Sequence, residues 1–409
     1  MKIGFYGNAN NYPFMLARAM QRLGHEVVFV VASPETLNRP EHRYPDISVP
    51  YPPWIVDASH RFRWHCLVPG LGRDGVFTHL NACDAVILNE EGPALARHLK
   101  VPYGVLLTGS DIAVFADPTL AKTLKPQAFD HPRWARELSR RFLPTSFILR
   151  KLVLPQRAGI ESSRFVAFLP KGLVPTIDLL LTDIGVRPSQ RAELLFTDCE
   201  LAPYVHPPVN TVVRIFSATR MTWLAQPGTD LTPLDLKGSD VMLRGLAMFL
   251  SRMQAPLDIH LVKKGRHLKE TMTLAAELGL ARQITWHEEM SQKDVLQQFQ
   301  LADIVLEQFG SSAVGIAGLD AMATGRPLIA NGRPEILERV TSHSSPILQA
   351  TSPEEICAHL QRIVPAADLR IAIGRASRAY VQEFFSSETA ARTCMSFFHS
   401  KGNLTCEAG

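Results

Sequence analysis

The sequence of 409 residues lacks the cysteine and histidine patterns of disulfide-rich and zinc-binding proteins. It contains no Cys-x-x-Cys pair and no His/Cys spacing typical of a zinc site, so we expect no metal site. The few cysteines are scattered widely along the chain, which is typical of reduced thiols in a cytoplasmic protein. They are Cys66, Cys83, Cys199, Cys357, Cys394 and Cys406.

Long apolar runs, repeats and low-complexity tracts are also missing. The amino-terminal segment MKIGFYGNANNYPF begins directly with a predicted strand and has no apolar stretch of signal-sequence length. No window is apolar over the length that a membrane span needs. The net charge of +4 suits anionic ligands but does not require nucleic acid. We therefore expect a soluble cytoplasmic protein that binds no nucleic acid.

The length exceeds the size at which a single hydrophobic core stops growing, and this favours two domains. Predicted strands and helices alternate in both halves, which is typical of parallel sheets with crossover helices. The proline-rich segment 198–212 is typical of a linker. We place one Rossmann-like domain at 1–205 and a second at 206–385. Residues 386–409 are expected to pack back on the first domain, although the pattern alone does not decide between the two.

A polar turn follows the first predicted strand, Lys2–Tyr6. It contains Gly7 and Asn8, at the place where dinucleotide-binding folds hold a phosphate. The G-x-G-x-x-G fingerprint is absent, and no acidic residue stands where ribose binding usually needs one. The turn is therefore a candidate for donor binding, while a nicotinamide cofactor is disfavoured.

The segment 302–330, ADIVLEQFGSSAVGIAGLDAMATGRPLIA, combines a strand, a glycine-rich loop and a helix in the order that builds an anion site. The apolar run 304–306 ends in Glu307, so this carboxylate lies at the carboxyl end of a strand, where open α/β sheets bind ligands. Small residues then leave the backbone N–H groups that open the next helix accessible to a phosphate. They are Gly310, Ser311, Ser312 and Gly315.

Two cations stand at related places in the second half. Arg220 follows a predicted strand at 211–217. Lys237 precedes Gly238 and a predicted helix at 239–252. Cations at a strand end and at a helix N-terminus concentrate positive potential where a diphosphate would lie. The alternative is a pair of solvated surface charges, and the placement of both residues argues against it.

These features resemble the retaining glycosyltransferases of the GT-B fold, a family that transfers sugars to polysaccharides, glycolipids and small molecules. The resemblance extends over most of the chain and rests on the order and spacing of several motifs. They are MKIGFYGN and LARAMQRLGHEVVFV at the start, PYGVLLTGSDI at 102–112, FSATR at 216–220, LKGSD at 236–240 and the segment 302–330. The resemblance implies an α/β protein with two Rossmann-like domains facing each other across a cleft and a nucleotide sugar as donor.

The resemblance also implies roles for the charged residues. In the family, an arginine and a lysine at the places of Arg220 and Lys237 grip the donor diphosphate, and no metal or other cofactor is expected. Two glutamates separated by seven residues usually address the donor sugar and the ribose. Here Glu307 would take the first role and Asp320 the second, with the intervening loop lengthened by about five residues, SSAVG. The alternative for Asp320 is a polar residue on an otherwise buried helix.

Three further candidates follow from the resemblance. Thr108 stands where many relatives carry a histidine, so Asp111 is the candidate on the acceptor side, and a helix cap is its equally open alternative. His287 follows a predicted strand within reach of a nucleotide base, with a structural role as the alternative. Gly265, in the loop KKGRH at 263–267, takes the place of the family's Gly-x-Gly turn.

The segment 131–155, HPRWARELSRRFLPTSFILRKLVLP, interleaves basic residues with bulky apolar ones. Such a composition suits peripheral contact with anionic lipid at the inner face of a membrane, and hence a lipid-linked acceptor. The favoured alternative is an ordinary amphipathic helix pair that packs its apolar face inward.

The sequence therefore predicts an enzyme that transfers a sugar from a nucleotide sugar to an acceptor hydroxyl with retention of the anomeric configuration. The acceptor is a glycan, a glycolipid or a small molecule. The catalytic candidates are Arg220, Lys237, Glu307 and Asp111, and the other residues named for the site are donor-binding candidates. Two alternatives stay open: a sugar-nucleotide epimerase of the same architecture, and a non-catalytic relative that binds sugar nucleotides.

Overall fold

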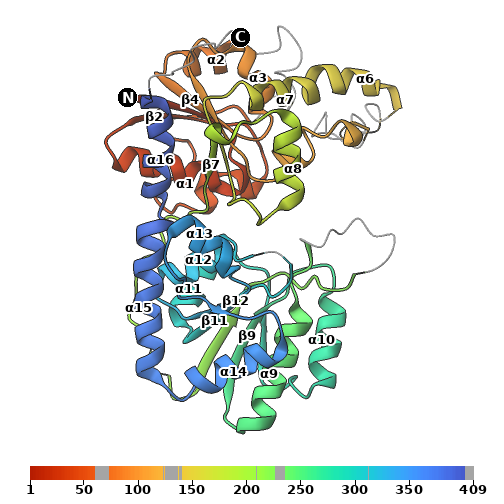
Figure 1. Ribbon diagram of the computed structural model, residues 1–409, viewed down its shortest axis with the longest axis vertical. Helices are drawn as coiled ribbons and strands as arrows, with labels where there is room; N and C mark the ends of the chain where they lie inside the picture. The colour runs from red at the N-terminus through yellow and green to blue at the C-terminus, as the bar shows by residue number, and fades with distance from the viewer. Residues whose placement is uncertain are drawn as a thin grey trace. The chain divides into compact units, whose positions relative to one another are not determined.

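The computed structural model describes residues 1–400 apart from several short stretches. These stretches are residues 60–72, 123, 125–136, 138–140, 209, 226–234 and 312. The chain divides into two compact units (Figure 1). The first unit comprises Met1–Leu169, Pro175–Leu194 and Ser387–Gly409, and the second comprises Pro170–Val174 and Leu195–Ser386.

The first unit is built on a parallel sheet with the strand order β3-β2-β1-β4-β5-β6-β7. Ile3 of β1 pairs with Val27 of β2 on one side and with Ala85 of β4 on the other. The chain order reverses at this point, so the carboxyl ends of β1 and β4 form a topological switch point. The strands are β1 Lys2–Tyr6, β2 Glu26–Val31, β3 Ile55–Asp57, β4 Ala85–Leu88, β5 Tyr103–Leu106, β6 Val166–Phe168 and β7 Arg191–Glu193.

Helices of the first unit bury small and apolar residues against each other and the sheet. A proline near its N-terminus starts α1, and Phe14 and its apolar neighbours on this helix are fully buried. Between α3 and α7 the backbones approach so closely that a Cβ at Gly159 would lie 1.9 Å from the Pro93 carbonyl oxygen. The α-helices are α1 Tyr12–Arg22, α2 Arg73–Asn81, α3 Gly92–Leu95, α4 Ser110–Ala113, α6 Thr145–Ile148, α7 Leu154–Glu161, α8 Pro175–Ile184 and α16 Ser387–His399. Shorter helical turns are η1 Ala9–Asn11, η2 Thr36–Asn38, η3 Pro40–His42, η5 Ala96–His98, η6 Pro118–Leu120, the π-helical η8 Leu149–Val153 and η9 Pro188–Gln190.

The second unit has its own parallel sheet, with the strand order β10-β9-β8-β11-β12-β13. The strands are β8 Val213–Ser217, β9 Leu257–Val262, β10 Ile284–His287, β11 Ile304–Leu306, β12 Leu328–Ala330 and β13 Leu348–Gln349. The helices are α9 Ser239–Met253, α10 Leu268–Glu277, α11 Gln292–Leu301, α12 Ile316–Ala323, α13 Pro334–Thr341, α14 Pro353–Ile363 and α15 Ala367–Phe384. The two sheets with their crossover helices confirm the predicted class of two Rossmann-like α/β units.

The last two helices belong to different units. α15 is held within the second unit by Arg378, whose guanidinium donates to the carbonyl oxygens of Ala202 at 2.8 Å and Ala323 at 3.0 Å. α16 belongs to the first unit, where Glu388 forms an ion pair of 2.5 Å with Arg22 of α1. The chain thus leaves the second unit at residue 386 and completes the first.

Within the described residues, no helix combines the length and apolarity needed to cross a membrane. The four cysteines in this part of the chain carry free thiols and are buried. They are Cys83, Cys199, Cys357 and Cys394.

Candidate functional site

The switch point of the second sheet brings together two residues predicted from the sequence. The strand order reverses between β8 and β11, where Ile304 pairs with Ile215. Glu307 follows β11 directly, and Arg220 lies just beyond the end of β8 with its side chain exposed. Both residues therefore stand at the same edge of the sheet, which is where open α/β sheets bind ligands.

Lys237 shares an electrostatic environment with both of them. Burial lowers the pKa of Lys237, and the charge of Arg220 lowers it further while that of Glu307 raises it. Burial raises the pKa of Glu307, and the Gln308 N–H and the charge of Lys237 oppose that rise. Glu307 is 9% exposed, and its Oε2 has no hydrogen-bond partner among the described residues. The site thus holds two cations beside a buried carboxylate with one oxygen unused.

The loop after β11 is fastened to the segment that carries Lys237. The Phe309 N–H donates to the Lys237 carbonyl oxygen at 2.8 Å. At Gly310 a Cβ would lie 2.0 Å from the Leu236 carbonyl oxygen, so only glycine permits this approach of the two backbones. The loop glycine therefore serves packing within the site and keeps Lys237 close to the end of β11.

Two helices begin at this edge without a side-chain cap. α9 starts after Gly238, immediately beyond Lys237, and α12 starts after Gly315. Their first N–H groups carry the partial positive charge of a helix N-terminus, which favours a bound anion. Ser311 is exposed in the loop before α12, whereas Ser312 lies outside the described residues.

Gly265 lies beside the segment that carries Arg220. Its φ of +122° is in the region that favours glycine, and a Cβ there would lie 2.5 Å from the Met221 nitrogen. The Met221 N–H donates to the Lys264 carbonyl oxygen at 2.6 Å. The predicted turn therefore approaches the Arg220 segment through its backbone.

His287 ends β10 and takes part in a polar cluster that sequence reasoning missed. Its Nε2 lies 2.7 Å from Nδ1 of His260, and the guanidinium of Arg214 lies 3.0 Å from the same Nδ1. Asp258 lies 2.8 Å from Nε2 of His260. Asp258 and His260 are two residues apart on one strand, and this spacing would have placed them on one face. His287 thus has a hydrogen-bonding partner within the protein, as the alternative of a structural role requires.

Asp320 is 6% exposed on α12 and accepts a hydrogen bond from the Thr197 hydroxyl. Both residues belong to the second unit. This contact fastens the segment that enters the unit to α12, as expected for a polar residue on an otherwise buried helix.

The candidates of the first unit lie at the carboxyl ends of its own strands. The side-chain amide of Asn8 donates to Asn11 and to the Asn38 carbonyl oxygen, and its oxygen accepts from the Phe14 N–H. These bonds use both hydrogens of the Asn8 amide. Gly7 precedes it, and its N–H donates to the Val30 carbonyl oxygen at 3.2 Å.

Asp111 is fully buried and fastens the loop after β5. Its carboxylate accepts the N–H groups of Thr108 at 2.8 Å and Gly109 at 2.8 Å, and the amide of Asn89 at 2.9 Å. Burial raises its pKa to about 6, and these N–H groups oppose the rise. Asp111 therefore connects the ends of β4 and β5.

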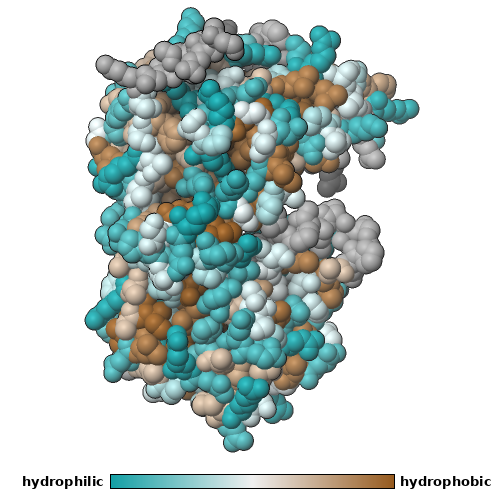
Figure 2. Space-filling model, viewed as in Figure 1, coloured by the Kyte–Doolittle hydropathy of each residue, from teal (hydrophilic) through white to brown (hydrophobic). Residues whose placement is uncertain are grey.

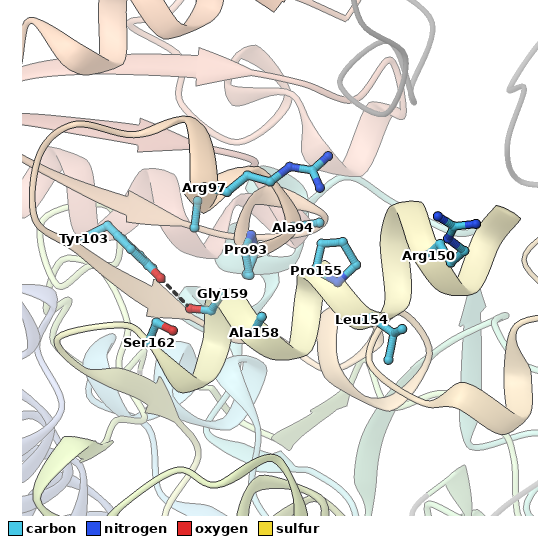
Figure 3. A pocket seen from close by; sticks show the side chains of 11 residues that line it. Pro93, Ala94, Arg97, Tyr103, Arg150, Leu154, Pro155, Ala158, Gly159 and Ser162 are labelled. Atoms are coloured by element: carbon cyan, nitrogen blue, oxygen red, sulfur yellow. Dashed lines mark hydrogen bonds between the residues drawn. The ribbon is translucent and has the colours of Figure 1, made fainter. Parts of the chain in front are cut away.

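A cavity of about 470 Å³ lies on the first unit between α3 and α7 (Figure 3). Its floor consists of small residues and prolines, and Arg97 and Arg150 stand on its rim. The Tyr103 hydroxyl donates to the Gly159 carbonyl oxygen at 3.0 Å at one end. Leu154 lines the cavity and is 53% exposed. Apolar side chains thus line this cavity beside two arginines.

Comparison with known proteins finds a family match within the second unit. Residues 234–380 match the family model described as "Glycosyl transferases group 1". The D-inositol 3-phosphate glycosyltransferase of Streptomyces griseus is 27% identical over 169 residues, which cover 39% of this chain and 35% of that protein. The enzyme of the same name from Corynebacterium jeikeium is 28% identical over 156 residues, covering 36% and 37%. The matched region thus spans about a third of each curated relative.

Solved structures are similar over nearly the whole chain. A glycosyltransferase from Rickettsia africae has a TM-score of 0.61 at 14% identity, with 97% of each chain covered. Anabaena HepE, solved in complex with UDP and glucose, has a TM-score of 0.58 at 12% identity, with 97% of this chain and 99% of HepE covered. At these identities the likeness concerns the fold. The likeness in fold and the match of residues 234–380 to the group 1 glycosyl transferase model agree with the resemblance to GT-B glycosyltransferases seen in the sequence.

Proposed function

We propose that this protein transfers a sugar from a nucleotide-sugar donor to an acceptor hydroxyl with retention of the anomeric configuration. The observation that carries the proposal is the pair of cations, Arg220 and Lys237, at the switch point of the unit that matches the group 1 family. Cleavage at the anomeric carbon leaves additional negative charge on the diphosphate. Cations and helix N-termini aimed at that group stabilise the transition state more than the ground state.

Each residue has a distinct role in this proposal. Arg220 and Lys237 hold the diphosphate, together with the N–H groups that begin α9 and α12. Glu307 accepts hydrogen bonds from the donor sugar through its unused carboxylate oxygen. The leaving phosphate takes the acceptor proton on the same face of the sugar, which gives retention. The diphosphate charge is met by protein groups, so the transfer needs no metal ion.

The donor is identified by a thermal-shift panel of sugar nucleotides, since a ligand that binds only the native state raises the melting temperature. UDP-glucose is the first donor to test because the related HepE has been solved with UDP and glucose. Product analysis follows, with the anomeric configuration read by NMR. An epimerase would change the donor without any acceptor, and a non-catalytic relative would bind the donor without turnover. Either result would refute the proposed transfer.

We further propose that the acceptor is presented at a lipid surface. Phe142 and Leu154 are 67% and 53% exposed, and the basic residues Arg150 and Lys151 lie between them in sequence. Hydrophobic side chains gather on the surface of the first unit where α7 runs (Figures 1 and 2). Residues 131–136 and 138–140 of the predicted lipid-contact segment lie outside the described residues.

Cosedimentation with vesicles tests this surface. Binding to vesicles with anionic lipid, and its loss in Phe142→Ser/Leu154→Ser, would support lipid contact. Equal recovery of the parent and the double variant in the supernatant would refute it.

A further inference from the structure

Thr219 carries a buried hydroxyl without a hydrogen-bond partner. It lies two residues beyond the end of β8 and is 8% exposed. Its Oγ1 has no partner within the described part of the chain, although its N–H contacts the Ser217 hydroxyl at 3.4 Å. Buried polar groups without partners are rare in native proteins, and each lowers stability. The hydroxyl of Thr219 is therefore a cost to the empty protein.

The position of this hydroxyl suggests its partner. Thr219 immediately precedes Arg220, and the register of β8 with β11 brings its segment alongside that of Glu307. Oε2 of Glu307 is a second buried polar atom without a partner at the same sheet edge. One of these groups donates a hydrogen bond and the other accepts one. A ligand that offers both phosphate oxygens and sugar hydroxyls would satisfy both.

We infer that Thr219 binds the donor directly, its hydroxyl donating to a phosphate oxygen of the nucleoside diphosphate. This inference rests on the proposed function of the same site. A phosphate fits better than a sugar hydroxyl at this position because the adjacent side chain is the exposed cation Arg220. The hydroxyl is buried in the empty protein, and rotation about χ1 exchanges its place with that of the methyl group. Donor binding is accompanied by that rotation.

Loss of the Thr219 hydroxyl should change the stability of the empty protein and its affinity for ligand in opposite directions. Thr219→Val keeps the shape of the side chain and removes the unpaired hydroxyl. We expect the melting temperature of the empty protein to rise by about 2–4 °C. Affinity for the nucleoside diphosphate should fall about tenfold, because one hydrogen bond to a charged group is lost. A purely structural role for Thr219 would instead lower the melting temperature.

The experiment compares the parent with Thr219→Val, Thr219→Ser and the control Thr222→Val. Thr222 is also buried, at 7% exposed, and lies three residues further along the chain. UDP, ADP, GDP and dTDP are titrated by calorimetry, and the diphosphate that binds the parent most tightly is compared with its free nucleoside. We expect Thr219→Val to weaken the diphosphate alone, Thr219→Ser to stay within about threefold of the parent, and Thr222→Val to bind normally.

The outcomes distinguish this inference from the function on which it rests. Failure of the parent to bind any of the four diphosphates would overturn both. Parent binding with unchanged affinity in Thr219→Val would overturn the role of Thr219 and leave the proposed function standing. A lower melting temperature in Thr219→Val, or equal weakening of diphosphate and nucleoside, would likewise overturn it.

Discussion

The imidazole rings of His260 and His287 lie stacked, with Nδ1 of the first 2.7 Å from Nε2 of the second. The guanidinium of Arg214 has only donors to offer, so it donates to Nδ1 of His260, which accepts. Burial, the neighbouring His260 and the charge of Arg214 lower the pKa of His287, against a smaller opposing effect of Asp258. Protonation of His287 therefore opposes folding.

Stability should fall as the pH drops below about 6.5, the pKa of histidine in an unfolded chain. Below that pH the unfolded chain binds a proton at His287 more readily than the folded chain does, because folding lowers the pKa of this residue. The stabilisation present at higher pH is therefore lost. Urea unfolding between pH 7.5 and 5.5 measures the slope. His287→Gln should flatten it, and His359→Gln on α14 is the control. Identical slopes in His287→Gln and the parent would refute the pair as the origin.

Asp111→Asn should lower the free energy of unfolding by about 1–3 kcal/mol. The carboxylate accepts hydrogen bonds from several N–H groups, and the NH₂ of an asparagine cannot accept them. Those donors come from Thr108, Gly109 and Asn89. Denaturant unfolding of the variant measures the loss. Asp117→Asn is the matched control, since Asp117 also accepts an N–H, that of Thr119, but at an exposed position. Unchanged stability with lost activity would assign Asp111 to the acceptor instead.

Arg220→Ala and Lys237→Ala should each remove about 2–4 kcal/mol of transition-state stabilisation while the fold survives. Both cations stand where the proposed leaving diphosphate gains charge. The measurement is kcat/KM for transfer, with circular dichroism to verify folding. Arg282→Ala removes an exposed cation of the same unit and should retain activity. Parental activity in both site variants would contradict the assignment.

Transfer should continue in excess chelator, because the proposed diphosphate grip consists of protein cations and helix N–H groups. Initial rates with EDTA and with added magnesium provide the comparison. A complete loss of activity that magnesium restores would show that a metal ion carries the diphosphate charge.

Residues 307–320 should exchange amide hydrogens more slowly when a sugar nucleotide is bound. Gly310 and Ser311 are partly or fully exposed in the loop, and donor contacts would order it. Glu307→Gln should impair transfer more than it weakens binding of the bare nucleoside diphosphate, since its carboxylate addresses the sugar. Equal exchange with and without donor, and unchanged kinetics of the variant, would leave the loop without a role in the reaction.

Local pattern determined several strands and the strand-end residues of the second unit. Apolar runs such as Leu257–Val262 and Ile304–Leu306 are strands in the structure, because burial on both faces of a parallel sheet needs continuous apolar residues. Arg220 and Glu307 could be placed because each follows such a run. Strands β3, β6, β7 and β13 contain two or three residues and carry too little periodicity to be found in the sequence. β11 is equally short and was found because Glu307 and a glycine-rich loop follow its apolar run.

Only the tertiary structure decided which polar groups meet and which remain without partners. His260 and His287 are 27 residues apart in sequence, and Asn89 and Asp111 are 22 apart, so no local spacing joins them. Whether the Thr219 hydroxyl has a hydrogen-bond partner depends on the segments that pack around it. The unit that α16 joins was equally hidden, because its apolar face suits any partner until contacts such as that of Glu388 with Arg22 select one. Propensity and periodicity act along the chain, whereas these contacts depend on packing between segments distant in sequence.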